Sequence, residues 1–81
     1  HDISLVSRTR NGETRMTARA SKLATSEGLS LAIIMNEVAK QLGGEGGGHD
    51  GAAGWSGSVD MITAESSFIS HVAKIPRSSE N

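Results

Sequence analysis

The glycine-rich run at residues 43–54, GGEGGGHDGAAG, holds the residues whose types and spacing most suggest chemistry. It contains seven of the chain's ten glycines and one histidine, His49. Consecutive glycines let backbone N–H groups approach an anion without interference from side chains, and a histidine directly after them adds a side-chain donor. The run therefore predicts either a phosphate-binding loop or a tight helix-to-strand crossover that needs small residues for packing.

Three other kinds of site fit the run poorly. Residues 46–51 satisfy the dinucleotide-binding spacing GxGxxG, but that motif needs a strand before it and a helix after it, and the reverse order is predicted here. A Walker phosphate-binding loop needs Lys and Ser/Thr after its last glycine, where this chain has His49 and Asp50. The histidines at positions 1, 49 and 71 lack the spacing of zinc ligands, so no metal site is predicted.

An arginine-bearing hairpin is predicted upstream of the run. Polar and apolar residues alternate on both sides of Asn11-Gly12, the strongest two-residue hairpin signal, which predicts a β-hairpin over residues 3–20. Its second strand would expose a row formed by Arg15, Thr17 and Arg19. Residues 1–22 carry five basic and two acidic residues, against three basic and seven acidic in the remainder. This basic third can face an anion such as phosphate, or it can be an ordinary solvated strand surface.

The remaining elements complete a small α/β domain. Residues 21–29 are predicted to form a loop, and Ser30 to cap a helix over residues 31–42, which Gly43 ends. A strand within residues 52–59 precedes a second helix, capped by Asp60 or Thr63 and closed by Pro76. The second helix would bury Met61, Ile62, Phe68, Ile69, Val72 and Ala73. The predicted fold class is α/β: a small mixed sheet, made of the hairpin and one further strand, with two helices in the order β-β-α-β-α.

Composition limits the classes of protein that fit. At 81 residues the chain is one domain with a thin core, and without cysteine it has neither disulfides nor thiolate metal sites. No apolar run reaches the roughly 18 residues of a membrane span, so a soluble cytoplasmic protein is expected. Of the two aromatic residues, Trp55 is predicted to be packed rather than exposed for base stacking. The chain begins with His1 rather than Met, which predicts a fragment of a longer protein.

Two short motifs resemble those of a known family. Residues 46–49 followed by residues 52–54 resemble the GGGH…AAG motif of the C-terminal DHH-associated domain of DHH-family phosphoesterases. Thr17-Ala18-Arg19, at the end of a predicted strand, is similar to that domain's S-x-R element, with Thr17 in place of serine. The resemblance covers residues 3–75, leaves 76–81 as a frayed tail, and is strongest to archaeal RecJ-like exonucleases. Alanyl-tRNA synthetases carry a related domain whose motif resembles GGGR…AQG instead.

The resemblance implies a substrate-binding role for particular residues. The glycines and the histidine of the motif would contact the phosphate or terminal nucleotide of the substrate, with an arginine as a second anion-binding side chain. The implied primary contacts are Arg19, Gly46, Gly47, Gly48 and His49, and the implied secondary contacts are Arg15, Thr17 and Ala53.

The resemblance also implies that catalysis takes place in another domain. The family's Mn²⁺ or Mg²⁺ ions are held by Asp and His residues of an N-terminal DHH domain, and no Asp-His-His triplet occurs here. The fragment alone would therefore hold no metal, contain no catalytic residue and have the DHH domain as its partner. Its ligand would be single-stranded nucleic acid or a short oligonucleotide, in an exonuclease or oligoribonuclease. Two alternatives remain: a phosphodiesterase of small nucleotides such as cyclic dinucleotides or phosphoadenosine phosphate, and a non-catalytic subunit of a replication complex.

Overall fold

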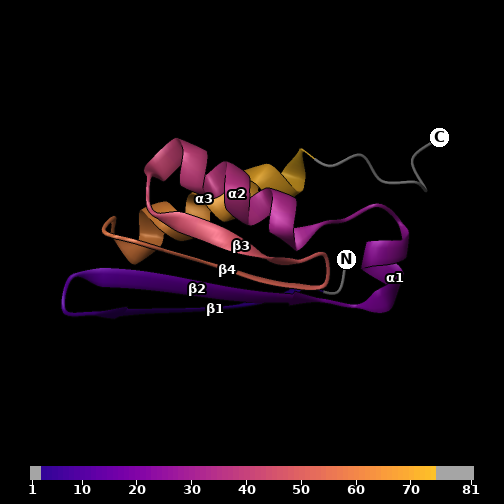
Figure 1. The fold of residues 1–81 in the computed structure, drawn as a ribbon, viewed down its shortest axis with the longest axis horizontal. Coiled ribbons are helices and arrows are strands. Elements are labelled where there is room, and N and C mark those ends of the chain that lie inside the picture. The colour runs from indigo at the N-terminus through magenta and orange to yellow at the C-terminus, as the bar shows by residue number, and fades with distance from the viewer. Residues whose placement is uncertain (1–2, 75–81) are drawn as a thin grey trace.

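The structure of the chain is a computed structural model, which describes residues 3–74. Four strands and three helices lie in two layers, with the sheet on one side and the two longer helices on the other (Figure 1). In chain order the elements are β1 (Ile3–Arg10), β2 (Glu13–Ala20), α1 (Lys22–Ser26), α2 (Leu31–Leu42), β3 (Glu45–His49), β4 (Ala52–Gly57) and α3 (Met61–Ala73). None of the described helices is long and apolar enough to cross a membrane.

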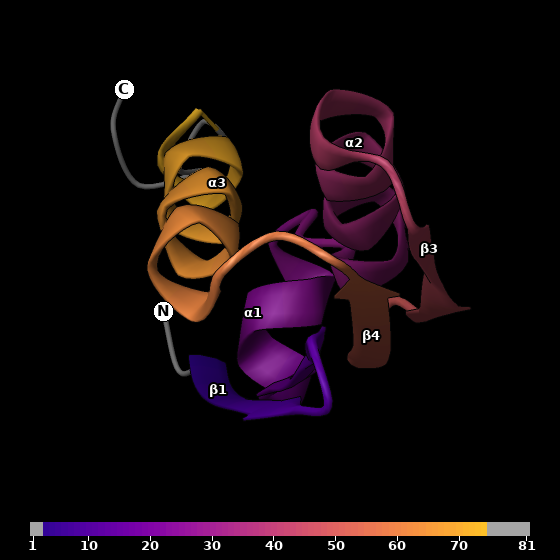
Figure 2. The ribbon, with the colours of Figure 1, turned by 90° about the vertical axis from the view of Figure 1, so that its left-hand side faces the viewer.

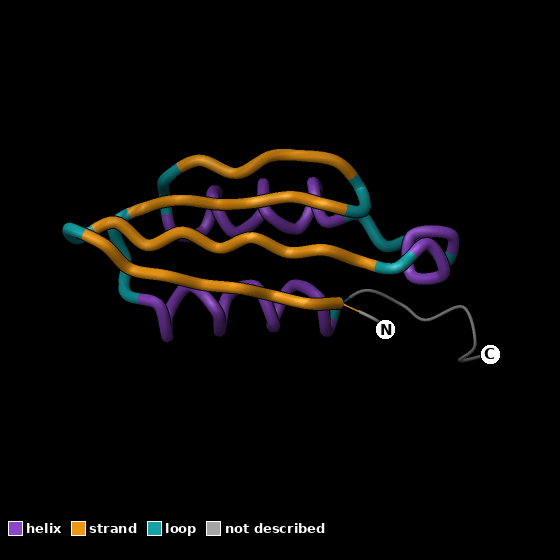
Figure 3. The backbone as a smooth tube through the Cα atoms, turned by 90° about the horizontal axis from the view of Figure 1, so that it is seen from below, coloured by secondary structure: helices purple, strands orange, loops and turns teal. Residues whose placement is uncertain are grey.

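The sheet has the strand order β1-β2-β4-β3, and every neighbouring pair is antiparallel. The predicted hairpin of residues 3–20 is confirmed. Its turn residues have positive φ, 53° at Asn11 and 80° at Gly12, as a type I′ turn requires at both central positions. Figure 3, from the side of the sheet, shows the four strands side by side with α2 and α3 behind them. The sheet is thus antiparallel throughout, whereas a mixed sheet was predicted.

Both long helices cover the same face of the sheet. Viewed end-on, α3 lies above the β1 side and α2 above the β3–β4 side (Figure 2). Every second residue of β2 is buried beneath them, which confirms the predicted alternation. The core consists of Met16, Ala18, Ala24, Leu29, Leu31, Ile34, Met35, Val38, Ala53, Trp55, Ala64 and Phe68. No helix within residues 3–74 covers the opposite face of the sheet (Figure 2 and Figure 3).

Helix α2 forms where the sequence predicted it, over residues 31–42. The Ser30 hydroxyl accepts a hydrogen bond from the backbone N–H of Ile33 at 3.4 Å, which satisfies a donor of the first turn. Gly43 ends the helix with φ 80°, a backbone conformation that side chains disfavour. The Trp55 indole N–H donates to the Gly43 carbonyl at 2.9 Å. This bond ties β4 to the end of α2.

The glycine run differs most from the sequence-based prediction. Residues 45–49 form a strand, β3, that pairs with β4, and the turn between them consists of Asp50 and Gly51. A loop was predicted because glycine is poor at forming strands. Pairing with β4 and packing against α2 override this weak preference. The anion-binding loop expected from the sequence is therefore the edge strand of a sheet.

Two helical assignments also need correction. Residues 22–26 form the short helix α1 within the predicted loop, with Ser21 as its N-cap. In α3, Ile62 and Ile69 are 78% and 61% exposed, although both were predicted to be buried, and Ala73 is also exposed. The reason is close packing: Ala64 and Ser67 face inward, and the Ser67 hydroxyl donates to the Gln41 side chain of α2 at 2.7 Å. These small residues let α3 approach α2, which turns both isoleucines outward.

The α/β fold class and the order of elements are confirmed, with α1 and β3 as additions. Asp60, one of the two predicted caps, begins α3, and Thr63 lies within the helix. The predicted end of this helix at Pro76 and the tail at residues 76–81 lie outside the described residues.

The Asp60 cap predicts a pH dependence of stability. Its carboxylate accepts hydrogen bonds from the Thr63 hydroxyl at 2.6 Å and the Thr63 backbone N–H at 3.0 Å, and these bonds lower the pKa of Asp60 below 3.8. Because the pKa of Asp60 is lower in the folded state, the cap stabilises the fold at any pH above the ordinary pKa of an aspartate. This stabilisation is lost as the pH falls through the lowered pKa of the folded state. Asp60→Asn should melt below the wild type at pH 6, with a smaller difference at pH 2. Thermal unfolding followed by circular dichroism measures both, and an unchanged difference would contradict the assignment.

Candidate nucleic-acid interface

The uncovered face of the sheet brings together most of the residues that the sequence predicted to form the site. We call it the open face. The register of the four strands aligns its residues in rows that cross the sheet. In the order β1, β2, β4, β3, the first row is Ser4, Arg19, Ala52 and His49, the second is Val6, Thr17, Gly54 and Gly47, and the third is Arg8, Arg15, Ser56 and Glu45. Successive rows are about 6.6 Å apart, because side chains on one face recur every second residue.

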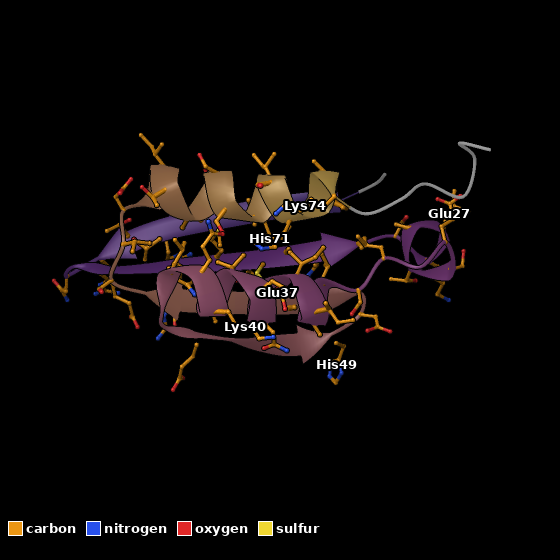
Figure 4. The ribbon with its side chains drawn as sticks, turned by 90° about the horizontal axis from the view of Figure 1, so that it is seen from above. Glu27, Glu37, Lys40, His49, His71 and Lys74 are labelled. Atoms are coloured by element: carbon orange, nitrogen blue, oxygen red, sulfur yellow. The ribbon has the colours of Figure 1, made fainter. Side chains whose placement is uncertain are left out.

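Arg19 and His49 share the first row. Arg19 is exposed at the end of β2, and His49 is exposed at the end of β3, with Ala52 between them. Two strand spacings place their Cα atoms about 10 Å apart, and the alanine between them leaves room above the sheet. In Figure 4 His49 projects beyond the outer edge of β3, away from both long helices. These two side chains can therefore contact one ligand on the open face.

The second row forms the floor between the basic residues. Gly54 and Gly47 have no side chains, and Thr17 supplies a hydroxyl next to them. Thr17, Gly47 and Gly54 of this row line a groove of about 450 Å³, together with the third-row residues of β2, β4 and β3. The Arg15 and Glu45 side chains belong to this groove as well. A ligand in it would lie against main chain, with a hydroxyl and a guanidinium at its side.

Glycine occurs at the three consecutive positions 46–48 of β3 for different structural reasons. A Cβ at Gly46 would lie 2.3 Å from the Met35 carbonyl oxygen of α2, and one at Gly48, where φ is +138°, would lie 2.5 Å from the Ala53 Cα. Packing therefore requires glycine at both positions. At Gly47 a Cβ would meet nothing within 4 Å. The fold leaves space for a side chain there, so packing does not account for the glycine at position 47.

Not every predicted contact reaches this face. Ala53 is 6% exposed and belongs to the core, so its side chain points toward the helices. Gly46 lies against α2 for the reason given above. The structure thus gathers Arg15, Thr17, Arg19, Gly47 and His49 on the open face, and it gives Gly46, Gly48 and Ala53 roles in packing.

A set of hydrogen bonds fixes the main chain next to His49. The Asp50 carboxylate accepts a hydrogen bond from the Ser30 hydroxyl at 2.6 Å, and its carbonyl accepts one from the Leu31 backbone N–H at 2.9 Å. The Gly51 carbonyl accepts one from the Ala20 backbone N–H at 2.9 Å. The β3–β4 turn is thereby bonded to the start of α2 and to the end of β2. We call these three bonds the turn clasp.

The charge of the open face is predominantly positive. It carries Arg8, Arg10, Arg15 and Arg19, with Glu13 and Glu45 as its acidic residues. Arg15 pairs with Glu13 at 3.3 Å, and both side chains are at least half exposed. Within residues 3–74, no three His, Asp or Glu side chains are grouped closely enough to hold a metal ion. The face can therefore attract an anion.

Part of this face was not predicted from the sequence. Gly54 and Ser56 in β4 and Glu45 in β3 line the groove, and none was predicted to belong to the site. Asp50-Gly51 is a two-residue hairpin signal of the same kind as Asn11-Gly12. Used in that way, it would have predicted the β3–β4 pairing, but not the β2–β4 pairing that completes the row from His49 to Arg19.

Comparisons with known proteins agree with this architecture. No curated protein sequence matches the chain. The solved structures that resemble it include the C-Ala domain of alanyl-tRNA synthetase from Aquifex aeolicus, with a TM-score of 0.72 and 18% sequence identity. The match covers 88% of this chain and 65% of that one, and at this identity it shows a shared fold alone. The family model of the DHHA1 domain matches residues 1–74, and the chain therefore belongs to the DHHA1 domain family.

Proposed function

We propose that this domain binds the phosphodiester backbone at the end of a single-stranded nucleic acid, as the substrate-binding part of a DHH-family phosphoesterase. One observation carries the proposal: Arg19, Thr17, Gly47 and His49 come from distant segments and meet in two adjacent rows of the open face. The parent protein would be a single-strand exonuclease of the RecJ-like type or an oligoribonuclease.

The side chains of the open face favour recognition of phosphate over recognition of bases. Arginine presents a fork of N–H donors that matches two phosphate oxygens, and bonds to ionised phosphate are about twice as strong as neutral ones. Base stacking needs exposed aromatic rings, but Trp55 and Phe68 are each 3% exposed. Contacts to phosphate carry no sequence information. Binding should therefore be independent of base sequence.

The proposal assigns hydrolysis to a DHH domain elsewhere in the protein. That domain would hold the Mn²⁺ or Mg²⁺ ions that activate water and stabilise the leaving oxygen. The part played by this chain is to hold the strand end on the open face while the scissile phosphate reaches those ions. A purified DHHA1 chain is accordingly expected to bind oligonucleotides and not to cleave them. A replication-complex partner is compatible with this arrangement.

A second candidate ligand is a small nucleotide such as a cyclic dinucleotide or phosphoadenosine phosphate. The groove of about 450 Å³ lies within the usual range of small-molecule sites, about 300–1,000 Å³. Competition separates the two ligands. A small nucleotide that displaces a labelled octanucleotide at a lower concentration than an unlabelled octanucleotide does would favour the second candidate.

Substitution of the first-row side chains tests the main proposal. Each of Arg19→Ala and His49→Ala should weaken binding of a short single-stranded oligonucleotide by about 1–3 kcal/mol, the worth of a hydrogen bond to a charged group. Fluorescence anisotropy measures the dissociation constants.

Lys40→Ala is the matched control for Arg19→Ala, because it also removes one positive charge. Lys40 lies on α2 (Figure 4), where it pairs with Glu37 at 3.1 Å, and not on the open face. The control should bind like the wild type when all variants are measured in the same low-salt buffer. Equal affinities for the wild type, Arg19→Ala and His49→Ala would refute the proposal.

A further inference from the structure

The turn end of the β1–β2 hairpin carries a second group of basic side chains on the open face. Residues Arg8, Arg10, Asn11, Glu13 and Arg15 line a cavity of about 380 Å³. We call these five residues the arginine cluster. None of them belongs to the row of Arg19 and His49. Arg15 and Arg19 lie four residues apart on β2, which corresponds to about 13 Å along the strand.

Of the two cross-strand pairs within the arginine cluster, Arg10 with Glu13 is electrostatically favourable and Arg8 with Arg15 is unfavourable. Arg8 lies directly opposite Arg15 in the register of β1 and β2, and like charges at opposed positions destabilise a sheet. Arg15 also pairs with Glu13, while neither Arg8 nor Arg10 has an ion pair within the described part of the chain. The cluster thus holds three positive charges against one negative. An anionic ligand between Arg8 and Arg15 would relieve their repulsion.

We propose that the arginine cluster is a second phosphate-binding site, which holds the strand several nucleotides away from the end bound by Arg19 and His49. The inference rests on the proposed function. A helical strand advances about 3.4 Å per nucleotide, so about 13 Å corresponds to at most about four nucleotides, and to fewer in a stretched strand. The two sites together would bind an oligonucleotide more tightly than a dinucleotide.

The surface between the two sites favours a nucleic acid over an acidic protein. The cores of protein interfaces are enriched in apolar residues and depleted of charged ones. On the open face, Val6 is the one large exposed apolar side chain among residues 3–74. Val6 lies in the second row, opposite Thr17, and its neighbours on the same face of β1 are Ser4 and Arg8. A lone apolar side chain with Arg8 on one side and Ser4 on the other suits a sugar–phosphate backbone rather than the apolar core of a protein interface.

Oligothymidylates of two and eight nucleotides test the second site. The double variant Arg8→Ala/Arg10→Ala should bind the octamer about 10- to 100-fold more weakly than the wild type, and it should bind the dinucleotide equally well. Its salt dependence for the octamer should also be shallower, by about 0.7 in the slope of log K against log salt for each phosphate that the variant no longer neutralises. Lys40→Ala controls for the removal of charge as such and should leave both affinities unchanged.

Arg8→Glu separates binding from folding. Glutamate at position 8 would lie opposite Arg15, which replaces repulsion with attraction, so the thermal midpoint should rise while octamer affinity falls. A fall in both would mean that the weaker binding reports damage to the fold, and it would overturn the second site.

The outcomes also distinguish this inference from the proposed function. Octamer binding that depends on Arg19 and His49, but not on Arg8 and Arg10, would refute the second site and leave the proposed function intact. Octamer binding that depends on neither pair would refute both. Loss of dinucleotide binding in the Arg8→Ala/Arg10→Ala variant would also refute the second site. A dinucleotide bound by Arg19 and His49 would not reach the arginine cluster.

Discussion

Gly46→Ala should lower the thermal midpoint of this chain by about 12 °C or more. The new Cβ would lie 2.3 Å from the Met35 carbonyl oxygen and 2.7 Å from the carbonyl carbon, distances at which α2 has to move off the sheet. Overpacking of this kind costs about 3 kcal/mol or more when main chain is the obstacle. In domains of this size each kcal/mol shifts the midpoint by roughly 4–8 °C. Thermal unfolding followed by circular dichroism measures the effect.

Gly47→Ala, one residue further on, is the matched control. A Cβ at this position meets nothing within 4 Å, so the thermal midpoint should stay within a few degrees of the wild type. The methyl group would stand on the floor of the groove beside Thr17 and Gly54, and oligonucleotide binding should weaken. The pair therefore predicts a fold defect at position 46 and a binding defect at position 47. Equal melting of the two variants would contradict the packing of α2 against β3.

Trp55→Ala should cost about 3–5 kcal/mol in the free energy of unfolding, the range for removing a large buried aromatic side chain. Trp55 is 3% exposed, and its ring covers Gly57, where a Cβ would lie 2.4 Å from a ring carbon. A chain of this length has a total stability of only about 4–12 kcal/mol, so much of the variant should be unfolded at 37 °C. Urea titration followed by circular dichroism measures the loss.

Trp55→Phe separates packing from the indole hydrogen bond. Phenylalanine keeps an aromatic ring in the core but cannot donate to the Gly43 carbonyl, which the indole reaches at 2.9 Å. Loss of the bond and of part of the ring should cost about 1–2 kcal/mol. A Phe variant as unstable as the Ala variant would mean that the hydrogen bond, and not burial, dominates. An Ala variant as stable as the wild type would contradict the position of Trp55 in the core.

Local signals in the sequence were sufficient for about half of the fold. Asn11-Gly12 between two alternating segments determined the hairpin and its exposed arginines, because a two-residue turn fixes the register of both strands. Helix α2 followed from its apolar stripe and its serine cap. In both cases the pattern, the turn chemistry and the final environment favour the same structure.

Strand β3 could not be recognised from local preference. Three of its five residues are glycine, and glycine is unfavourable within strands. The strand exists because β4 pairs with it and because α2 packs against Gly46, and neither contact is visible in the composition of the strand itself. The buried face of α3 was not predicted for a related reason. Ala64 and Ser67 face inward because they are small, and not because they are hydrophobic.

The candidate site was predicted as a set of residues but not as an arrangement. Arg19 and His49 were identified by resemblance to motifs, 30 positions apart in the sequence. Their shared row follows only from the pairing of β4 with both β2 and β3, and the pairing with β2 has no local signal in the sequence. The same pairing places Gly54 in one row with Thr17 and Gly47, whereas Ala53 was the residue of β4 that had been predicted as a contact.

The turn clasp determines how this domain can respond to a ligand. Because the residues after His49 are bonded to α2 and to β2, the main chain of the site moves only together with the sheet and the helix. Under the proposed function, binding would restrict side-chain rotamers of Arg19 and His49 and order little backbone, which lowers the entropic cost of association. The domain should therefore bind its ligand as one rigid body, with no hinge between α2 and the β3–β4 hairpin.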